Sequence, residues 1–564
     1  MDKPWIAHYE SHVPPVIDIP STPLADCLRR NARRFPDHPA LIFFDNKISF
    51  KELNDAVDRF AAGLQKLGVA PGDRVALYMP NCPQYVISYY AVLRIGAIVV
   101  PCNPLYVARE LEHQLNDAGA RVAVVLSSFY PTLKEIRANT PLEYVIVANI
   151  KDYFPPVLKA LFTLLKEKQE GHYLDLSTEE DTVWFTDFLA EAPEVPAPLH
   201  VEMNDTACLL YTGGTTGVPK GAELTHRNLL VNAMQCQVWL NVKPAREIVL
   251  AALPLSHSYG MTTCMNQGVY SASTIILIPN PRDLKFVLKN IVKHRPTLFP
   301  GVPTMYVAIN NYPDIQKYDL SSIRACISGG AGLPKEVQIK FQELTGGKLV
   351  EGYGLTEASP VTHANPINGE NRIGTIGLPW PNTDCKLVDV EDGKTEVPVG
   401  EPGELCIKGP QVMKGYWNKP EETANVLRDG WLYTGDIAVM DEDGYFRIVD
   451  RKKDMIIAGG FNIYPRDIEE VLYENPKVKE AVAVGIPHPY RGETVKVYVV
   501  LKEGEAATAE EIIRWCRGRL AKYKVPTDVE FRQELPKSMV GKILRRVLRE
   551  EEMAKRAAEK EGKS

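Results

Sequence analysis

The stretch from Tyr211 to Gly221 reads Tyr-Thr-Gly-Gly-Thr-Thr-Gly-Val-Pro-Lys-Gly, a loop rich in glycine and threonine with a lysine near its end. Glycine lets the backbone approach an anion closely, while threonine hydroxyls donate hydrogen bonds and lysine adds a positive charge. The apolar residues from Ala207 to Tyr211 predict a buried strand that leads into the loop. We therefore expect this stretch to bind phosphate, with a solvent-exposed glycine turn as the alternative.

The sequence of this loop differs from that of the common nucleotide-binding loop. A Walker A loop has glycine immediately before its lysine, and here Pro219 stands before Lys220. The ordinary P-loop nucleotide hydrolase is therefore excluded. The candidate phosphate-binding residues are Thr212, Gly213, Gly214, Thr215, Thr216, Gly217 and Lys220.

Length and composition limit the class of protein. A chain of 564 residues exceeds the size at which one hydrophobic core stops growing, so at least two folding units are expected. Hydrophobic residues make up 45% and charged residues 24%, which is ordinary for a globular protein. The net charge of −6 offers no general attraction for nucleic acid, so no nucleic-acid partner is expected.

Cysteine usage and hydropathy indicate a cytoplasmic location. The ten cysteines are scattered without paired spacing, which favours reduced core thiols over a zinc site or disulfides. The first residues show no secretory signal, and no window of eighteen apolar residues predicts a membrane span. Between Val157 and Leu165 apolar residues recur at helical spacing beside lysines, so this helix either packs on its own domain or touches the inner face of a membrane.

The order of the predicted elements indicates an α/β fold. The first three hundred residues alternate strand-like and helix-like stretches, which predicts a largely parallel sheet covered by helices. Residues 386–450 change to short strands separated by turns and predict a β-rich subdomain. A fresh pattern of helices and strands fills 451–564. We therefore expect a large layered α/β domain over 1–450 and a small α+β domain over 451–564.

Further motifs follow the loop in the order and approximate spacing of the adenylate-forming enzymes, the superfamily of acyl-CoA synthetases, luciferases and peptide-synthetase adenylation domains. The chain resembles this family over its whole length. Most members carry serine where this chain has Gly214. The matching motifs are Tyr353-Gly354-Leu355-Thr356-Glu357, Tyr433-Thr434-Gly435-Asp436, Asp450 to Met455 with Gly459-Gly460, and Pro536-Lys537 with Gly541-Lys542.

The resemblance implies ATP and Mg²⁺ as cofactors, CoA as the acceptor substrate, and a mobile C-terminal domain that carries the catalytic lysine. Glu357 would hold the magnesium ion and Thr356 the phosphate region. Lys542 would bridge the incoming carboxylate and the α-phosphate, and His257 would line the acyl site near the reacting carbonyl. The implied nucleotide and CoA contacts outside the loop are Gly330, Ala331, Gly352, Tyr353, Gly354, Asp436, Arg451, Lys453, Gly459 and Gly460.

The resemblance also implies a two-step mechanism. A carboxylate must first receive a leaving group, and attack on the α-phosphorus of ATP supplies one as an acyl-adenylate. Because two anions meet in this step, the site needs cations where charge develops. The C-terminal domain would then turn about a hinge at Lys453, withdraw Lys542 and present Gly459-Gly460 to the arm of CoA.

The acyl substrate is the least determined element. The stretch from Leu253 to Cys264 is mostly apolar or small, which favours an aliphatic acid. The sequences of the motifs taken together most resemble those of bacterial long-chain fatty acid–CoA ligases. Alternatives are a medium-chain or aryl acid–CoA ligase, an adenylating enzyme with a carrier-protein acceptor, and a nucleotide-binding regulator without turnover. A peripheral membrane contact and a homodimer stay open as partners.

Overall fold

The computed structural model describes residues 3–212, 219–458, 461–488, 490–538, 541 and 543–561. The chain forms two compact units, and each is described by itself. The first contains Met1–Asp384 with Ile407–Leu432, and the second contains Cys385–Cys406 with Tyr433–Ser564. The domain boundary expected between Asp450 and Arg451 concerns which part of the chain moves during the reaction, and it remains a prediction.

The first unit is organised around an eight-stranded sheet with the order β18-β9-β8-β4-β3-β5-β6-β7. The strands from β8 to β7 in this order pair in parallel, while β9 pairs antiparallel with β8 and with β18. The predicted parallel α/β sheet is therefore confirmed. The strands are β3 (Arg74–Tyr78), β4 (Ile98–Pro101), β5 (Val122–Leu126), β6 (Tyr144–Ala148), β7 (Thr182–Trp184), β8 (Thr206–Thr212), β9 (Lys220–Thr225) and β18 (Gly415–Tyr416).

The first unit also contains two four-stranded sheets, with the orders β10-β11-β1-β2 and β12-β13-β14-β15. Leu298 links them, because it forms parallel bridges to Val249 of β10 and to Ala325 of β12. Their strands are β1 (Pro39–Phe43), β2 (Asn46–Ser49), β10 (Ile248–Ala251), β11 (Thr274–Leu277), β12 (Ala325–Ser328), β13 (Lys348–Gly354), β14 (Val361–Ala364) and β15 (Leu378–Pro379).

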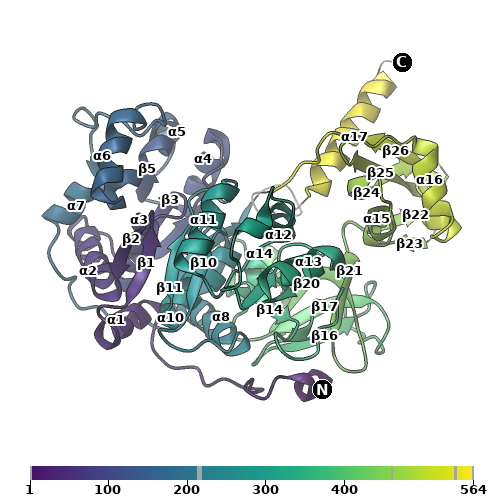
Figure 1. Ribbon diagram of the computed structural model, residues 1–564, viewed down its shortest axis with the longest axis horizontal. Helices are drawn as coiled ribbons and strands as arrows, with labels where there is room; N and C mark the ends of the chain where they lie inside the picture. Colours follow the sequence, from purple (N-terminus) through teal and green to yellow (C-terminus); the bar gives the residue numbers. More distant parts are fainter. Residues whose placement is uncertain are drawn as a thin grey trace. The chain divides into compact units, whose positions relative to one another are not determined.

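Helices cover these sheets (Figure 1). The helices α4 (Ala108–Ala118) and α5 (Tyr130–Ile136) share a core with one face of the large sheet, where Leu111, Leu115 and Leu133 are buried. The fully buried α3 (Pro83–Arg94) contacts β3 and β4 and packs against α2 (Phe50–Lys66). The other helices named in this unit are α1 (Leu24–Arg34), α6 (Pro156–Leu165), α7 (Phe185–Glu191), α8 (His226–Trp239), α9 (Ser258–Gly260), α10 (Gln267–Tyr270), α11 (Leu284–His294), α12 (Pro303–Asn310), α13 (Lys335–Thr345) and α14 (Pro420–Val426).

Helix α2 shows how local sequence determines an element. Ser49 accepts a hydrogen bond from the backbone of Glu52, and the Glu52 side chain accepts one from the backbone of Ser49, which forms a capping box. The apolar stripe that includes Val57 and Phe60 is fully buried, and each such side chain contributes ~1.5 to 3 kcal/mol. The helix ends before Gly68, whose φ of 82° suits glycine.

The second unit contains strands from two sheets. One has the order β16-β17-β20-β19, with β21 paired to β20, and the other has the order β23-β22-β25-β24, with β26 paired to β25. The helices and strands expected within 451–564 include α15, β24, β25 and α16. The bounds are β16 (Asp384–Val388), β17 (Gly403–Lys408), β19 (Leu427–Arg428), β20 (Trp431–Met440), β21 (Phe446–Arg451), β22 (Ile456–Ala458), β23 (Phe461–Ile463), α15 (Pro465–Tyr473), β24 (Val478–His488), β25 (Gly492–Leu501), α16 (Ala509–Arg517), β26 (Asp528–Phe531) and α17 (Arg545–Glu561).

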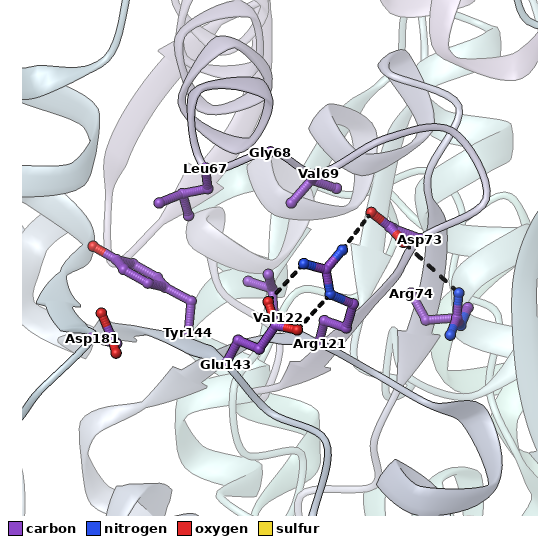
Figure 2. Close-up of a pocket in the computed structure, with 10 residues that line it drawn as sticks. All are labelled: Leu67, Gly68, Val69, Asp73, Arg74, Arg121, Val122, Glu143, Tyr144 and Asp181. Carbon is purple, nitrogen blue, oxygen red and sulfur yellow. Dashed lines mark hydrogen bonds and ion pairs between the residues drawn. The ribbon is translucent and has the colours of Figure 1, made fainter.

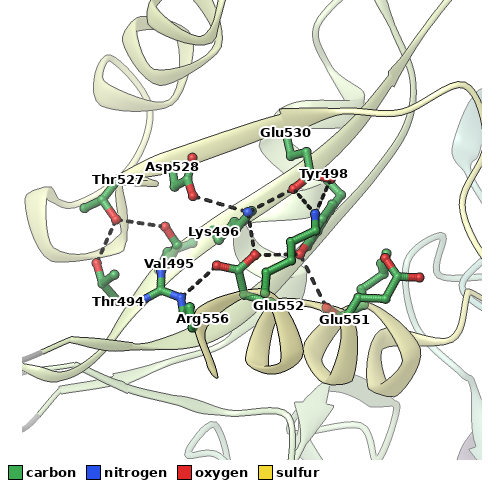
Figure 3. A network of polar contacts seen from close by, with 12 residues as sticks. Thr494, Val495, Lys496, Tyr498, Thr527, Asp528, Glu530, Glu551, Glu552 and Arg556 are labelled. Atoms are coloured by element: carbon green, nitrogen blue, oxygen red, sulfur yellow. Dashed lines mark hydrogen bonds and ion pairs between the residues drawn. The ribbon is translucent and has the colours of Figure 1, made fainter. Parts of the chain in front are cut away.

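A buried lysine attaches the last helix to this second sheet (Figure 3). The Lys496 side chain of β25 is 7% exposed, and its Nζ lies 2.7 Å from Oε2 of Glu552 on α17 and 3.0 Å from Oε2 of Glu530 on β26. The Tyr498 ring centroid lies 5.2 Å from the same ammonium. Burial lowers the pKa of Lys496, but the hydrogen bonds to Glu552 and Glu530 outweigh that effect and raise its pKa above the usual value.

We expect Lys496→Met to destabilise the second unit by ~3 to 5 kcal/mol, because it removes a buried cation that pairs with both Glu552 and Glu530. Thermal unfolding followed by calorimetry, with hydrogen exchange of α17, measures the effect. Arg549→Gln is the matched control on the same helix, since the Arg549–Glu493 pair is more exposed and contributes ~1 kcal/mol or less. The double variant Lys496→Met/Glu552→Leu should recover stability. A Lys496→Met protein that unfolds at the wild-type temperature would contradict this account.

Candidate functional site

The predicted phosphate loop lies in the sequence between β8 and β9, two strands of the large sheet that pair antiparallel. Strands β8 and β9 are in register so that Thr212 faces Lys220 and Tyr211 faces Gly221. A Cβ on Gly221 would lie 3.1 Å from the Tyr211 ring, so glycine lets the ring pack over the neighbouring strand. The sequence therefore places Thr212 and Lys220 together at the base of the loop. The predicted contacts Gly213, Gly214, Thr215, Thr216 and Gly217 lie outside the described residues.

Tyr416 connects Glu357 to the β8–β9 strand pair. The Tyr416 hydroxyl of β18 donates a hydrogen bond to Oε1 of Glu357 at 2.8 Å, and β18 pairs directly with β9. Burial and the charge of Glu357 raise the pKa of Tyr416, so the hydroxyl keeps its proton. Thr356 lies beside Glu357, with its hydroxyl 3.3 Å from that of Ser258.

Lys220 contacts the same segment of chain. Its ammonium forms an ion pair and hydrogen bond with Oε2 of Glu422 on α14, and it lies 5.3 Å from the centroid of the Tyr416 ring. Neither Tyr416 nor Glu422 was found by the sequence analysis. The only local signal is that Tyr416 is the aromatic residue of a short Gly-Tyr-Trp stretch. Tyr416 and its partner Glu357 are 59 residues apart in the sequence, and Glu422 and its partner Lys220 are 202 residues apart.

The glycines assigned to the adenine pocket lie on β12 and β13 or directly after them. Gly330 has a φ of 82°, which L side chains rarely adopt. A Cβ on Gly354 would lie 2.2 Å from the carbonyl oxygen of Pro360, so β13 can approach this segment only with glycine. The nearby Ser328 hydroxyl is buried and has no hydrogen-bond partner within the described part of the chain, so it could serve a bound base. The predicted contacts located here are Gly330, Ala331, Gly352, Tyr353 and Gly354.

His257 lies at the start of α9, and its Nδ1 accepts a hydrogen bond from the backbone N–H of Tyr259 at 3.2 Å. The fully packed Tyr259 ring turns toward β12, where its hydroxyl donates to the carbonyl of Ile327 at 2.7 Å. A Cβ on Gly329 would lie 3.0 Å from this ring. The predicted acyl-site segment therefore packs directly on the strand that carries the predicted adenine pocket.

In the second unit, Asp436 and Arg451 face each other across β20 and β21, with Nε of Arg451 3.0 Å from Oδ1 of Asp436. The Asp436 side chain is buried, so its carboxylate is held in one orientation. Lys453 follows on the same stretch, and burial and then the charge of Arg451 lower its pKa. These three predicted residues therefore form one group within their unit. Lys542, Gly459 and Gly460 lie outside the described residues.

The joint that precedes Lys453 is tied to the last helix. Asp450 is buried, and burial raises its pKa to about 6 despite the nearby charge of Arg545. Arg545, at the start of α17, lies 3.4 Å from both Asp450 and Asp454 and 2.6 Å from Glu469. The start of α17, three residues after Lys542, is therefore fixed to the predicted hinge segment.

The carboxylate at Glu357 fits a magnesium ion that binds together with a nucleotide. Within the described ranges there is no group of three or more histidine, cysteine, aspartate or glutamate side chains that could hold a metal. Mg²⁺ commonly binds through one or two carboxylates together with substrate phosphates, so a full protein cage is not required. Tyr416 orients Glu357 by a hydrogen bond to Oε1, so within the described part of the chain this bond occupies one carboxylate oxygen and not the other.

A cavity of about 270 Å³ lies at the opposite edge of the large sheet, where β3, β5, β6 and β7 begin (Figure 2). Its arginines have acceptors within the protein: Arg121 donates to Glu143 at 2.6 Å and to Asp73 at 3.2 Å, and Arg74 donates to the carbonyl of Gly119 at 2.9 Å. Ligands of open α/β sheets bind at the carboxyl ends of the strands. We therefore interpret this cavity as structural.

Comparisons with known proteins identify families, relatives and solved structures that this chain resembles. The family model described as AMP-binding enzyme matches residues 28–417, and the model of the AMP-binding enzyme C-terminal domain matches residues 467–542. A Bacillus subtilis protein named long-chain-fatty-acid–CoA ligase is 50% identical, with 98% of each chain covered. A protein of the same name from Escherichia coli O6:H1 is 43% identical, with 98% of this chain and 99% of that one covered. The crystal structure of ATP-bound MatB from Rhodopseudomonas palustris is 31% identical, covers 93% of this chain and 98% of its own, and has a TM-score of 0.82.

Proposed function

The chain belongs to the AMP-binding enzyme family, and we propose that it joins a long-chain fatty acid to CoA through an acyl-adenylate. The observation that carries the substrate class is the 50% identity, over 98% of the chain, to a protein named long-chain-fatty-acid–CoA ligase. The geometry agrees, since Lys220 and Glu357 lie at one edge of the sheet beside a buried, mostly apolar segment from Leu253 to Met265.

The reaction has two steps. The fatty acid carboxylate attacks the α-phosphorus of ATP, the bond to the β-phosphate oxygen breaks, and pyrophosphate leaves. The thiol of CoA, after losing its proton, then attacks the acyl carbonyl, and AMP leaves with the electron pair of the carbon–oxygen bond. The ligase activity therefore requires ATP, Mg²⁺ and CoA.

Each charged residue has a distinct task in the first step. Lys220 and the loop hydroxyls bind phosphate oxygens, and Glu357 holds Mg²⁺, which neutralises charge on the phosphates when bound. Lys542 bridges the incoming carboxylate and the α-phosphate. Asp436 accepts hydrogen bonds from the ribose hydroxyls, and Arg451, which already contacts Asp436, donates to the same sugar.

The remaining residues line the adenine and acyl pockets or take part in the domain movement between the two steps. Tyr353 stacks on the adenine ring, and His257 lines the acyl site without acting as a base, because a thiol near its own pKa needs none. The C-terminal domain turns about Lys453 after adenylation and brings Gly459 and Gly460 to the arm of CoA. One site thereby serves two reactions in sequence.

CoA-dependent release of AMP from Mg·ATP, measured across straight-chain acids from C4 to C18 with coumarate and benzoate, tests this function. We expect the highest kcat/KM at C12 or longer, because the acyl segment offers apolar surface and each buried CH₂ contributes ~0.8 kcal/mol. A maximum at short or aromatic acids would contradict the long-chain assignment. Adenylate formation without transfer to CoA would indicate a carrier-protein acceptor, and the absence of any turnover would favour a regulator.

Helix α6 supports a second part of the proposal, a peripheral contact with a membrane on the cytoplasmic side. Its apolar residues Val157, Leu161, Leu164 and Leu165 are 75%, 49%, 80% and 70% exposed. Phe162 alone is buried among the helix residues. A convex, apolar helix of this kind matches the surface of a bilayer, where long-chain acids also dissolve. Within the described ranges no helix is long and apolar enough to span a membrane.

The positive charge near α6 also supports contact with a membrane. Lys159, Lys166 and Lys168 are exposed on α6 or directly after it. Lysines beside an apolar helix attract anionic lipid head groups, so the two contributions act on one surface. Phe162 attaches the helix to the domain through Phe154 and His172, with ring centroids 5.4 and 5.7 Å apart.

We expect Leu164→Ser/Leu165→Ser to reduce binding to vesicles of phosphatidylglycerol and phosphatidylcholine by about tenfold or more, since burying each leucine contributes ~1.5 to 3 kcal/mol. Vesicle sedimentation of the full chain measures this, while turnover of a fatty acid in detergent-free solution should stay within about twofold. Val195→Ser is the matched control, because Val195 is 68% exposed and lies outside α6. Equal binding by the wild type and the double variant would contradict the contact.

A further inference from the structure

Lys220 is held by a carboxylate that belongs to none of the sequence motifs. Its side chain is 14% exposed, and its ammonium is paired with Oε2 of Glu422, whose side chain is 39% exposed. Lys220 begins β9 and ends the phosphate loop, whereas Glu422 lies in the first turn of α14. The pair therefore joins the loop to a segment about two hundred residues later in the chain.

Backbone contacts determine where Glu422 lies. Tyr416 of β18 faces Ala222 of β9, and the N–H of Trp417 donates to the carbonyl of Gly221 at 2.8 Å. The chain then turns into α14, and the N–H of Tyr416 donates to the hydroxyl of Thr423 at 2.8 Å. This turn places the start of α14 over the start of β9, so the approach of Glu422 to Lys220 is built into the fold.

The same ammonium is the group that would bind phosphate. A carboxylate and a phosphate oxygen are both anionic acceptors, so they compete for Lys220 and repel each other when both lie near it. The Tyr416 ring, 5.3 Å from the ammonium, supports the cation from another side, and its hydroxyl holds Glu357. Lys220 can therefore exchange its carboxylate for phosphate while it keeps its contact with the ring.

We propose that Glu422 is an internal competitor of the nucleotide, which holds the ammonium of Lys220 until phosphate oxygens displace it. This inference rests on the proposed function, since it assigns Lys220 to ATP. Glu422 sets the affinity for ATP below the value that Lys220 alone would give. When pyrophosphate leaves, the carboxylate takes the ammonium back, which favours release of that product.

Titration of the full chain with Mg·ATP by calorimetry, without fatty acid or CoA, tests the proposal. Glu422→Gln should lower the Kd for Mg·ATP by roughly 2-fold to 5-fold, the range expected for a partly exposed ion pair. The difference should shrink at high ionic strength, because salt screens the competing charge. In a Lys220→Gln background, Glu422→Gln should change the Kd by much less, since the contested ammonium is gone.

Glu421→Gln is the matched control. Glu421 is the exposed neighbour of Glu422 on α14, so the substitution removes the same charge without touching the Lys220 pair. Glu422→Asp, which keeps the charge on a shorter side chain, should fall between the wild type and Glu422→Gln. An unchanged or higher Kd in a folded Glu422→Gln protein, or an equal gain in Glu421→Gln, overturns the proposal. A wild-type chain that binds no Mg·ATP overturns the proposed function as well.

Discussion

The repulsion between two anions is the constraint on which this structure depends. A carboxylate must reach the phosphorus of a polyanionic nucleotide, so cations have to stand where the two meet and must be held there in advance. The fold places candidate groups for this need where β8 ends and β9 begins, next to β18. Lys220 and Tyr416 are brought together by strand pairing, and Tyr416 in turn orients Glu357.

The second unit holds its own predicted site residues on a separate framework. Asp436 and Arg451 form one cross-strand pair, and Arg545 ties the start of α17 to the joint that contains Lys453. The buried Lys496 attaches the middle of α17 to the sheet. Under the proposed hinge at Lys453, a helix fixed in this way would follow the movement of the joint, and Lys542 precedes that helix by three residues in the sequence.

Local signals predicted much of the fold and part of the site. The capping box at Ser49 and the alternating strands of the second unit depend on neighbouring residues, so the sequence alone identifies them. Glycine is required at position 354 because a side chain there would collide with the carbonyl of Pro360, six residues later. The sequence indicated this position only because it belongs to a family motif. Tyr416 and Glu422 were missed because their partners are distant in the chain, and no spacing rule connects a short strand to a lysine two hundred residues earlier.

The central claim is that a positioned cation on the C-terminal domain enables the meeting of the two anions. Exchange of labelled pyrophosphate into ATP, driven by a fatty acid, measures that step without CoA. Lys542→Ala should reduce the exchange rate by about 10²-fold or more, as expected when a charge that stabilises the transition state is lost. The same variant should still transfer a supplied acyl-adenylate to CoA. Exchange at the wild-type rate in Lys542→Ala would contradict the account.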